Sequence, residues 1–112
     1  MYQYKAMLLN VVDGDTVDMD VDMGFNVRIK QRLRLLGINT AEINAKDAAY
    51  RQLAIDAKQF VLGHISVGTT YIINTYKGDK YGRLLAEIYL SPGVTLNDLL
   101  LQNTLAVPYH SN

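Results

Sequence analysis

Hydrophobic and polar residues alternate over much of the first 36 positions, which is the pattern of strands that bury one face. Residues 3–12 form the first such segment, before the turn signal Asp13-Gly14. In the second, apolar residues alternate with acidic ones: Val17, Met19, Val21 and Met23 with Asp18, Asp20 and Asp22. Residues 27–36 form a third strand, with basic side chains on one parity and an apolar set that Gln31 interrupts on the other.

An acidic strand followed after a short turn by a basic strand predicts an antiparallel hairpin in which opposite charges face each other. This interpretation makes both stripes structural ion pairs, formed by Asp18, Asp20 and Asp22 with Arg28, Lys30 and Arg32. The alternative is that the basic stripe follows a nucleic acid or that the aspartates bind metal.

After a loop at residues 37–46, apolar residues recur at helical spacing from Asp47 to His64. The predicted buried stripe consists of Ala49, Leu53, Ala57, Phe60, Val61 and His64. Asn44 or Asp47 is the expected N-cap, and Gly63 lies near the end. We interpret His64 as a core or boundary residue rather than a ligand.

The remaining pattern predicts strands at residues 69–76 and 84–90 and a short helix from Thr95 to Gln102. Asn103 is expected to end that helix in the left-handed conformation, and residues 107–112 are expected to form a tail. Three strands, a helix, two strands and a helix match the layout of the OB-fold. We therefore predict a mainly β, α+β fold: a five-stranded Greek-key barrel with a helix between strands three and four and a short C-terminal helix.

The composition sets limits on this picture. At 112 residues we expect residues 1–112 to form one domain, and 49% hydrophobic residues suffice for a core. The absence of cysteine excludes thiolate zinc sites and thiol catalysis. A net charge of zero counts against a passive nucleic-acid binder but less against an enzyme. We find no bilayer-spanning apolar run and no signal peptide, which leaves localisation open between an intracellular and a mature secreted protein.

Candidate chemistry lies in three short stretches, residues 13–17, 34–42 and 79–83. Carboxylates such as Asp15 bind hard cations such as calcium. The guanidinium groups of Arg34 and Arg83 suit a phosphodiester, and Glu42 could take a proton from a bound water. The working hypothesis is metal-assisted phosphodiester hydrolysis.

These stretches together resemble the staphylococcal nuclease (thermonuclease-like) family. The matching pieces are Val12-Asp13-Gly14-Asp15-Thr16-Val17, Arg34-Leu35-Leu36-Gly37-Ile38-Asn39-Thr40-Ala41-Glu42 and Asp79-Lys80-Tyr81-Gly82-Arg83-Leu84. Leu96-Asn97 and Leu105-Ala106 agree as well, so the resemblance extends from about Met7 to Tyr109. It implies an OB-fold barrel that cleaves DNA and RNA with calcium, acting on single-stranded or frayed substrate, without a membrane and as a monomer.

The resemblance also implies roles for particular residues. Asp15 and Asn39 would bind the metal through their side chains, and Thr40 would do so through its backbone carbonyl. Glu42 would be the general base, and Arg34 and Arg83 would stabilise the charged phosphoryl group. The expected substrate contacts are Lys80, Tyr81 and Tyr109.

Two departures from the family pattern bear on activity. Asn39 stands where the family commonly has a second carboxylate, which removes one negative charge from the metal site and should weaken calcium binding. Ala41 replaces the usual proline. The alternative to an active nuclease is therefore a weakened, nuclease-like OB domain that binds nucleic acid or protein without cutting.

Simple strand parity raises a geometric question about Arg34, which falls on the polar face of its strand, whereas Asp15 is in phase with the buried set. For the two to meet, the strand must bulge or coil, for instance at Gln31, or the site must lie at the rim of the barrel.

Overall fold

The computed structural model describes residues 1–78 and 81–109. Its elements are β1 (Tyr2–Asp13), β2 (Thr16–Asp22), β3 (Arg28–Leu35), β4 (Ile38–Asn39), α1 (Ala48–His64), β5 (Thr70–Tyr76), β6 (Leu84–Ser91), β7 (Val94–Thr95), α2 (Leu96–Gln102) and β8 (Val107–Pro108). No helix in the described part of the chain is long and apolar enough to cross a membrane.

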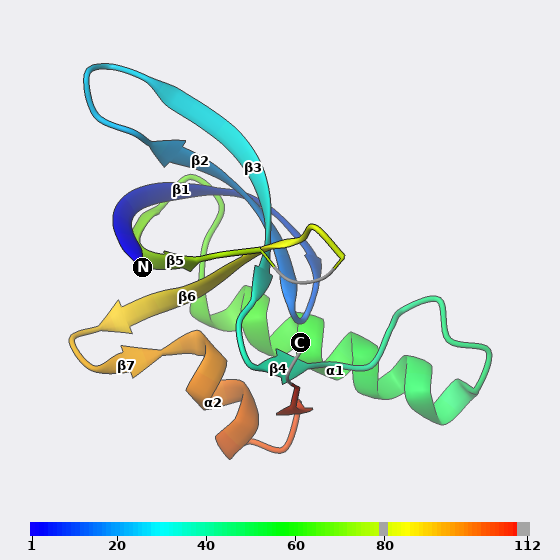
Figure 1. The fold of residues 1–112 in the computed structure, drawn as a ribbon. Helices are drawn as coiled ribbons and strands as arrows, with labels where there is room; N and C mark the ends of the chain where they lie inside the picture. Colours follow the sequence, from blue (N-terminus) through cyan, green and yellow to red (C-terminus); the bar gives the residue numbers. More distant parts are fainter. Residues whose placement is uncertain (79–80, 110–112) are drawn as a thin grey trace.

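Five strands close into the predicted OB-like barrel (Figure 1). The sheet order is β3-β2-β1-β5-β6, and a parallel pairing of β3 with β6, from Leu33–Leu84 to Leu35–Ala86, joins its two edges. The long strand β1 makes this possible, because its first half pairs with β5 and its second half extends along β2. α1 lies between the third and fourth barrel strands, as expected.

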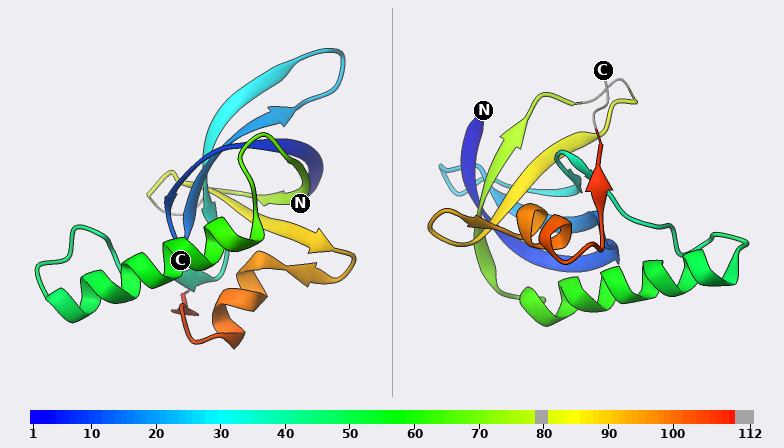
Figure 2. Two further views of the ribbon diagram at one scale, coloured as in Figure 1. Left: turned by 180° about the vertical axis from the view of Figure 1, so that it is seen from behind. Right: turned by 90° about the horizontal axis from the view of Figure 1, so that it is seen from below.

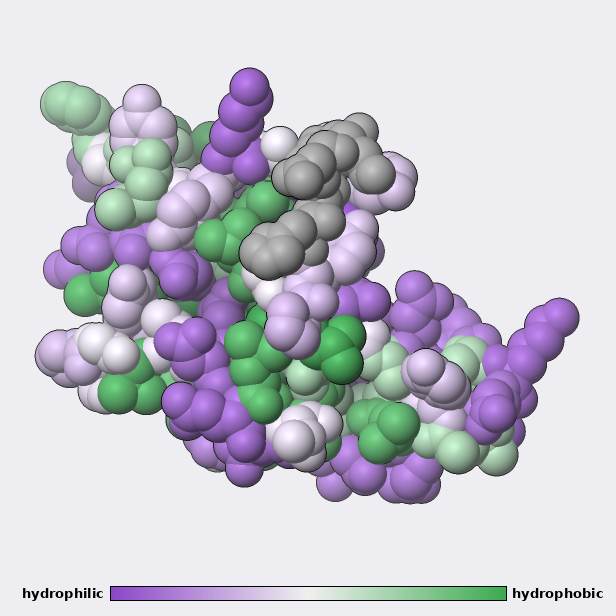
Figure 3. Space-filling view, turned by 60° about the horizontal axis from the view of Figure 1, so that its bottom comes forward, coloured by the Kyte–Doolittle hydropathy of each residue, from purple (hydrophilic) through white to green (hydrophobic). Residues whose placement is uncertain are grey.

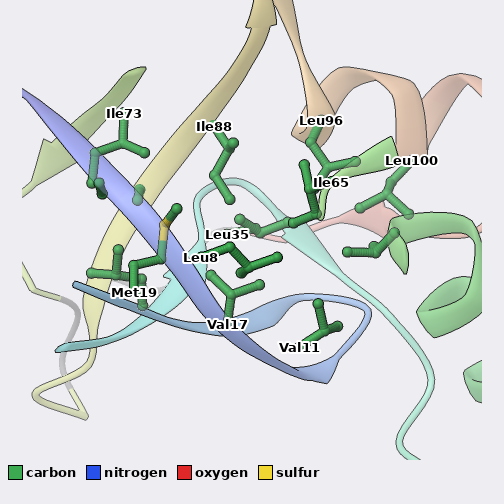
Figure 4. Close-up of a cluster of buried hydrophobic side chains, with 14 of the residues drawn as sticks. Leu8, Val11, Val17, Met19, Leu35, Ile65, Ile73, Ile88, Leu96 and Leu100 are labelled. Carbon is green, nitrogen blue, oxygen red and sulfur yellow. The ribbon is translucent and has the colours of Figure 1, made fainter. Parts of the chain in front are cut away.

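The barrel interior holds the inward-facing apolar residues of every long strand (Figure 4). The largest fully buried side chains include Leu8, Met19, Leu35, Ile73 and Ile88. Ile65, just after α1, and Leu96 and Leu100 of α2 join the same core. The alternation in the sequence therefore identified the inward-facing side of the sheet, although Met23 and Ile29 on that side remain partly exposed.

Helix α1 begins as predicted, with Asp47 capping the backbone N–H groups of Ala49 and Tyr50. Its predicted buried stripe is only partly right, because Ala57 and Val61 are buried whereas Ala49 and Leu53 are exposed, and the buried Ala54 was not predicted. The first turns extend beyond the barrel (Figure 2), and the space-filling view shows hydrophilic residues at the tip of this arm (Figure 3). A helix buries its apolar stripe only where another element covers it.

His64 is exposed, so its interpretation as a core or boundary residue was wrong. Its ring stacks on Phe60, and its Nδ1 lies 2.7 Å from the Phe60 carbonyl oxygen. The left-handed residue after α2 is also not the predicted one: Asn103 has φ −93°, and Thr104 has φ +56°.

Two very short strands were missed in the predicted loop and tail. Ile38 pairs with Pro108 and Asn39 with Val107, which fastens the C-terminal segment beside the end of β3. Strands of two residues carry no readable alternation, and their pairing joins segments about 70 positions apart in the chain.

Arg28 and Arg32 of the β2–β3 hairpin form ion pairs with the aspartates of β2, which confirms the structural interpretation for these residues. Asp18 is in register with Arg32, and the two side chains make two hydrogen bonds of 2.8 and 3.2 Å. Arg28 contacts Asp20 at 3.0 Å. The hydrogen bond from Arg32 lowers the pKa of the Asp18 carboxyl below its usual value.

We predict that Gly14→Ala destabilises the fold by about 1–3 kcal/mol, because a Cβ there would lie 2.8 Å from the Cβ of Ala57 in α1. Gly63→Ala is the matched control. A Cβ at Gly63 meets nothing within 4 Å, so better helix propensity should stabilise that variant by about 1 kcal/mol. Urea unfolding measures both, and equal midpoints for Gly14→Ala and the parent would contradict the close packing of the β1–β2 turn on α1.

Candidate active site

The β1–β2 turn holds Asp15 in a buried position at the rim of the barrel, with 8% of its surface exposed. Its Oδ1 accepts a hydrogen bond from the Thr16 hydroxyl at 2.9 Å, and its Oδ2 accepts one from the backbone N–H of Thr40 at 3.0 Å. The backbone N–H of Leu35 donates to the Asp15 carbonyl at 2.8 Å. Asp15 thereby joins the turn to the segment that follows β3.

Arg34 is buried, with 6% of its surface exposed, and its Nη1 lies 2.9 Å from Oδ2 of Asp15. The contact is an ion pair rather than a hydrogen bond, because Nη1 has no hydrogen-bond partner among the described residues. Nη2 donates to Oδ1 of Asn39 at 2.7 Å. The guanidinium therefore spans the two oxygen-bearing side chains that sequence analysis assigned to a metal.

Arg34 and Asp15 meet because the site lies at the rim of the barrel, not because β3 bulges. The β2–β3 pairing runs without a register shift from Asp22–Arg28 to Thr16–Arg34, so there is no bulge at Gln31. β3 becomes buried on both faces from Leu33 onward, where it also pairs with β6. Asp15 lies just beyond the paired residue Thr16, at the edge that Arg34 reaches.

A pocket of about 380 Å³ opens at this rim. Its lining consists of Asp13, Asp15, Thr16, Gln31, Arg32, Arg34, Asn39, Ala41, Glu42, Gly82, Arg83 and Leu84. Five predicted site residues from three separate stretches thus meet in one concavity. Polar and charged groups dominate the lining, which suits an ionic substrate.

Three other predicted residues, Thr40, Tyr81 and Tyr109, are not among the described residues that line the pocket. Thr40 is buried behind it and acts through the amide that holds Asp15. Tyr109 lies against the site, with its ring centroid 5.2 Å from Cζ of Arg34. Tyr81 is exposed, with its ring centroid 5.0 Å from Cζ of Arg83. Lys80 lies outside the described residues.

Asp13 is a pocket residue that sequence analysis did not select. Burial is the main cause that raises the pKa of its carboxyl, and the neighbouring charges of Asp15 and Glu42 add to the effect. Lys58 of α1 opposes it. Its position in the Asp-Gly-Asp-Thr stretch could have marked Asp13 as a site residue. It was not selected because an aspartate in a turn more often hydrogen-bonds to its own backbone.

The oxygen-rich lining fits a hard cation by its chemistry. A carboxylate offers about four acceptor sites, and Thr16, Thr40 and Arg34 approach three of those of Asp15. Among residues 1–78 and 81–109, no group of three or more His, Asp or Glu side chains converges as a preformed metal centre. Asn39 contributes an amide oxygen rather than a carboxylate to the lining.

Comparison with known proteins identifies the family. A family model described as staphylococcal nuclease homologue matches residues 32–112, which is most of the chain. The chain belongs to this family. Residues 32–112 include four of the five predicted residues in the pocket, and Asp15 precedes the matched region.

Individual relatives agree with this assignment at modest identity. The chain is 28% identical over 104 residues to a thermonuclease of Staphylococcus hyicus, covering 92% of this chain and 57% of that protein. It is 26% identical over 102 residues to an uncharacterized endonuclease of Escherichia coli, covering 91% and 59%. An uncharacterized protein of Methanocaldococcus jannaschii is 29% identical over 131 residues, covering 97% and 61%. The chain thus spans about three fifths of the length of these relatives.

We predict that Asp15→Ala lowers the free energy of unfolding by about 3–5 kcal/mol, because it leaves the buried guanidinium of Arg34 without its counter-charge. The matched control is Asp20→Ala, which removes a hairpin ion pair and should cost about 0.2–1 kcal/mol. Adding Arg34→Met to Asp15→Ala should recover part of the loss. Urea unfolding of the three variants tests this, and similar losses for the two single variants would refute it.

Proposed function

We propose that this chain is a calcium-dependent phosphodiesterase that hydrolyses single-stranded or frayed DNA or RNA. The observation that carries the proposal is the meeting of Asp15, Arg34, Asn39, Glu42 and Arg83 in one pocket. The names endonuclease and thermonuclease, given to relatives, support the same reaction class.

Arg34 and Arg83 would bind the phosphodiester. Arg34 lies in β3 and Arg83 directly precedes β6, and the β3–β6 pairing brings them to the same pocket. Forked N–H donors from both would reach phosphate oxygens and stabilise the charge that grows as the leaving oxygen departs. The ion pair with Asp15 and the hydrogen bond to Asn39 hold Arg34 in place before substrate arrives.

Glu42 would take the proton from the attacking water. It follows β4 and is exposed to solvent at the pocket. A carboxylate there can accept a proton and release it to solvent after each cleavage.

Asp15 and Asn39, with the backbone carbonyl of Thr40, would hold calcium. The bound cation would act as a Lewis acid that stabilises negative charge on the phosphoryl oxygens. Asn39 offers an oxygen without a charge, so we expect a higher calcium requirement than a carboxylate would give.

Aromatic groups at the edge of the site would contact the substrate strand. Tyr109 lies over Arg34 and Tyr81 over Arg83, so each ring adjoins a phosphate-binding guanidinium. Lys80 would add charge toward a neighbouring phosphate. We expect the enzyme to act as a monomer, as the family resemblance implies.

A second candidate function is a nucleic-acid or protein binding module without cleavage. It is favoured by Asn39, whose amide oxygen is already engaged by Arg34 at 2.7 Å. Cleavage separates the two candidates, because a binding module would retain oligonucleotides in calcium without cutting them.

We predict calcium-dependent cleavage of a fluorescently labelled single-stranded oligonucleotide that a chelator abolishes. Glu42→Gln and Arg83→Ala should each lower the rate about 10²–10³-fold, by analogy with loss of a transition-state donor. The controls are Asp56→Asn on α1 and Arg28→Ala on the hairpin, which should keep most of the activity. If the parent does not cut at any calcium concentration, the enzyme proposal is refuted and the binding module is the remaining candidate.

We predict that Asn39→Asp lowers the calcium concentration needed for half-maximal cleavage, because a second carboxylate strengthens the cation site. Arg34 can donate to the new carboxylate as it does to the amide, so the fold should be retained. A calcium titration of the rate measures the change. An unaltered titration curve would remove Asn39 from the metal site.

A further inference from the structure

A second concavity, of about 190 Å³, opens at the mouth of the barrel beside the β2–β3 hairpin. Its walls include Tyr4, Met23, Ile29, Gln31, Leu33 and Leu84. These residues share the inward-facing parity of their strands with buried residues such as Val21 and Ala86. The mouth is thus a continuation of the barrel interior toward solvent, next to the hairpin that rises above the barrel in Figure 1.

Large apolar side chains remain exposed around this mouth. Met23 is 38% exposed, Ile29 44% and Leu84 40%, although all three point to the inner side of the barrel. Exposed apolar groups around a concavity are typical of a binding surface, and barrel mouths are common ligand sites. No charged side chain of a described residue lines the mouth, so it suits a neutral, flat group.

The mouth is continuous with the candidate active site. Gln31 and Leu84 line both concavities, so they form the wall between them. Gln31 is also the polar residue that interrupts the inner face of β3, opposite Met19 of β2. Its amide offers two N–H donors and one acceptor oxygen at the boundary between a charged pocket and an apolar one.

We propose that the mouth binds one unpaired nucleobase of the nucleotide next to the phosphate held by Arg34 and Arg83. Ile29 and Leu84 would pack against the faces of the base, and the Gln31 amide would hydrogen-bond to its edge. This inference rests on the proposed function and specifies its substrate as a strand with an exposed base.

The size of the mouth supports a single base. Drug-sized ligands occupy pockets of about 300–1,000 Å³, so a cavity of about 190 Å³ accepts one planar ring system rather than a base pair. The charge pattern agrees, because the phosphate side holds the guanidiniums of Arg34 and Arg83 beside Arg32, which pairs with Asp18, and the base side is apolar. Bases of unpaired strands are free to turn outward and stack on protein groups.

Binding without cleavage tests the mouth. A labelled six-residue oligothymidylate and a series carrying one abasic site at successive positions are titrated with the parent chain in a chelator, with fluorescence anisotropy as the readout. We expect one abasic position to weaken binding about tenfold, as loss of a packed base does. Ile29→Ser and Gln31→Ala should each weaken binding of the intact oligonucleotide several-fold and erase that positional effect.

The matched control is Lys30→Ala, on the outer face of the same strand. It should weaken intact and abasic strands by the same factor, because its contribution is charge alone. An abasic series with uniform affinity for the parent, or a positional effect that survives in both Ile29→Ser and Gln31→Ala, would overturn the inference. Sedimentation velocity tests the remaining alternative, that a second copy of the chain occupies the mouth. A parent dimer that Ile29→Ser dissociates, with oligonucleotide binding unchanged, would make the mouth a contact between copies and would also overturn the inference.

Hydrolysis is assayed separately so that the two proposals can fail independently. The parent chain is given calcium and methyl 4-nitrophenyl phosphate, which carries the scissile diester without a nucleobase. Turnover of this substrate together with equal affinity for all abasic strands would support the phosphodiesterase and refute the base site. A positional abasic effect without any turnover of this substrate or of the oligonucleotide would support the base site on a binding module and remove the enzyme.

Discussion

The buried contact between Arg34 and Asp15 is the constraint on which the rim of this barrel depends. A guanidinium and a carboxylate, each less than a tenth exposed, stay charged in such a place only when they neutralise each other. Asp15 also receives the amide of Thr40, and Arg34 also reaches Asn39. One ion pair therefore fixes the β1–β2 turn, the end of β3 and the short strand β4 relative to one another.

The β2–β3 hairpin separates two kinds of chemistry by strand parity. Its outer face is neutralised by ion pairs such as Arg32–Asp18, which stabilise the hairpin and leave little net charge for a ligand. Its inner face changes along its length, from the core residue Leu33 to the exposed Ile29. Gln31 lines both the polar pocket and the apolar mouth and so lies at the boundary between them.

The long elements could be predicted because period and length act together in them. The alternation in β2 determined both the strand and its buried face, and the helical spacing after Asp47 located α1. The sequence could not show where α1 leaves the barrel, so Leu53 was assigned to the core although 49% of it is exposed. Strands β4 and β8 were missed because two residues have no period and their partner lies at the far end of the chain.

The order of the three motifs in the sequence was enough to select the candidate site residues, but it did not predict how they are arranged. Parity placed Arg34 on the wet face, and only the closure of β3 against β6 makes both faces of the strand buried at that point. The closure of β3 against β6 also affects when the site forms during folding. Leu33 and Leu84 are paired neighbours of Arg34 and Arg83, yet some 50 positions separate them along the chain. Strand pairing over such a range is intrinsically slow, because the entropy of closing the intervening loop is lost before the contact forms. A partly folded chain would therefore hold Arg34 and Arg83 apart, and the pocket that both of them line would form only in the finished molecule.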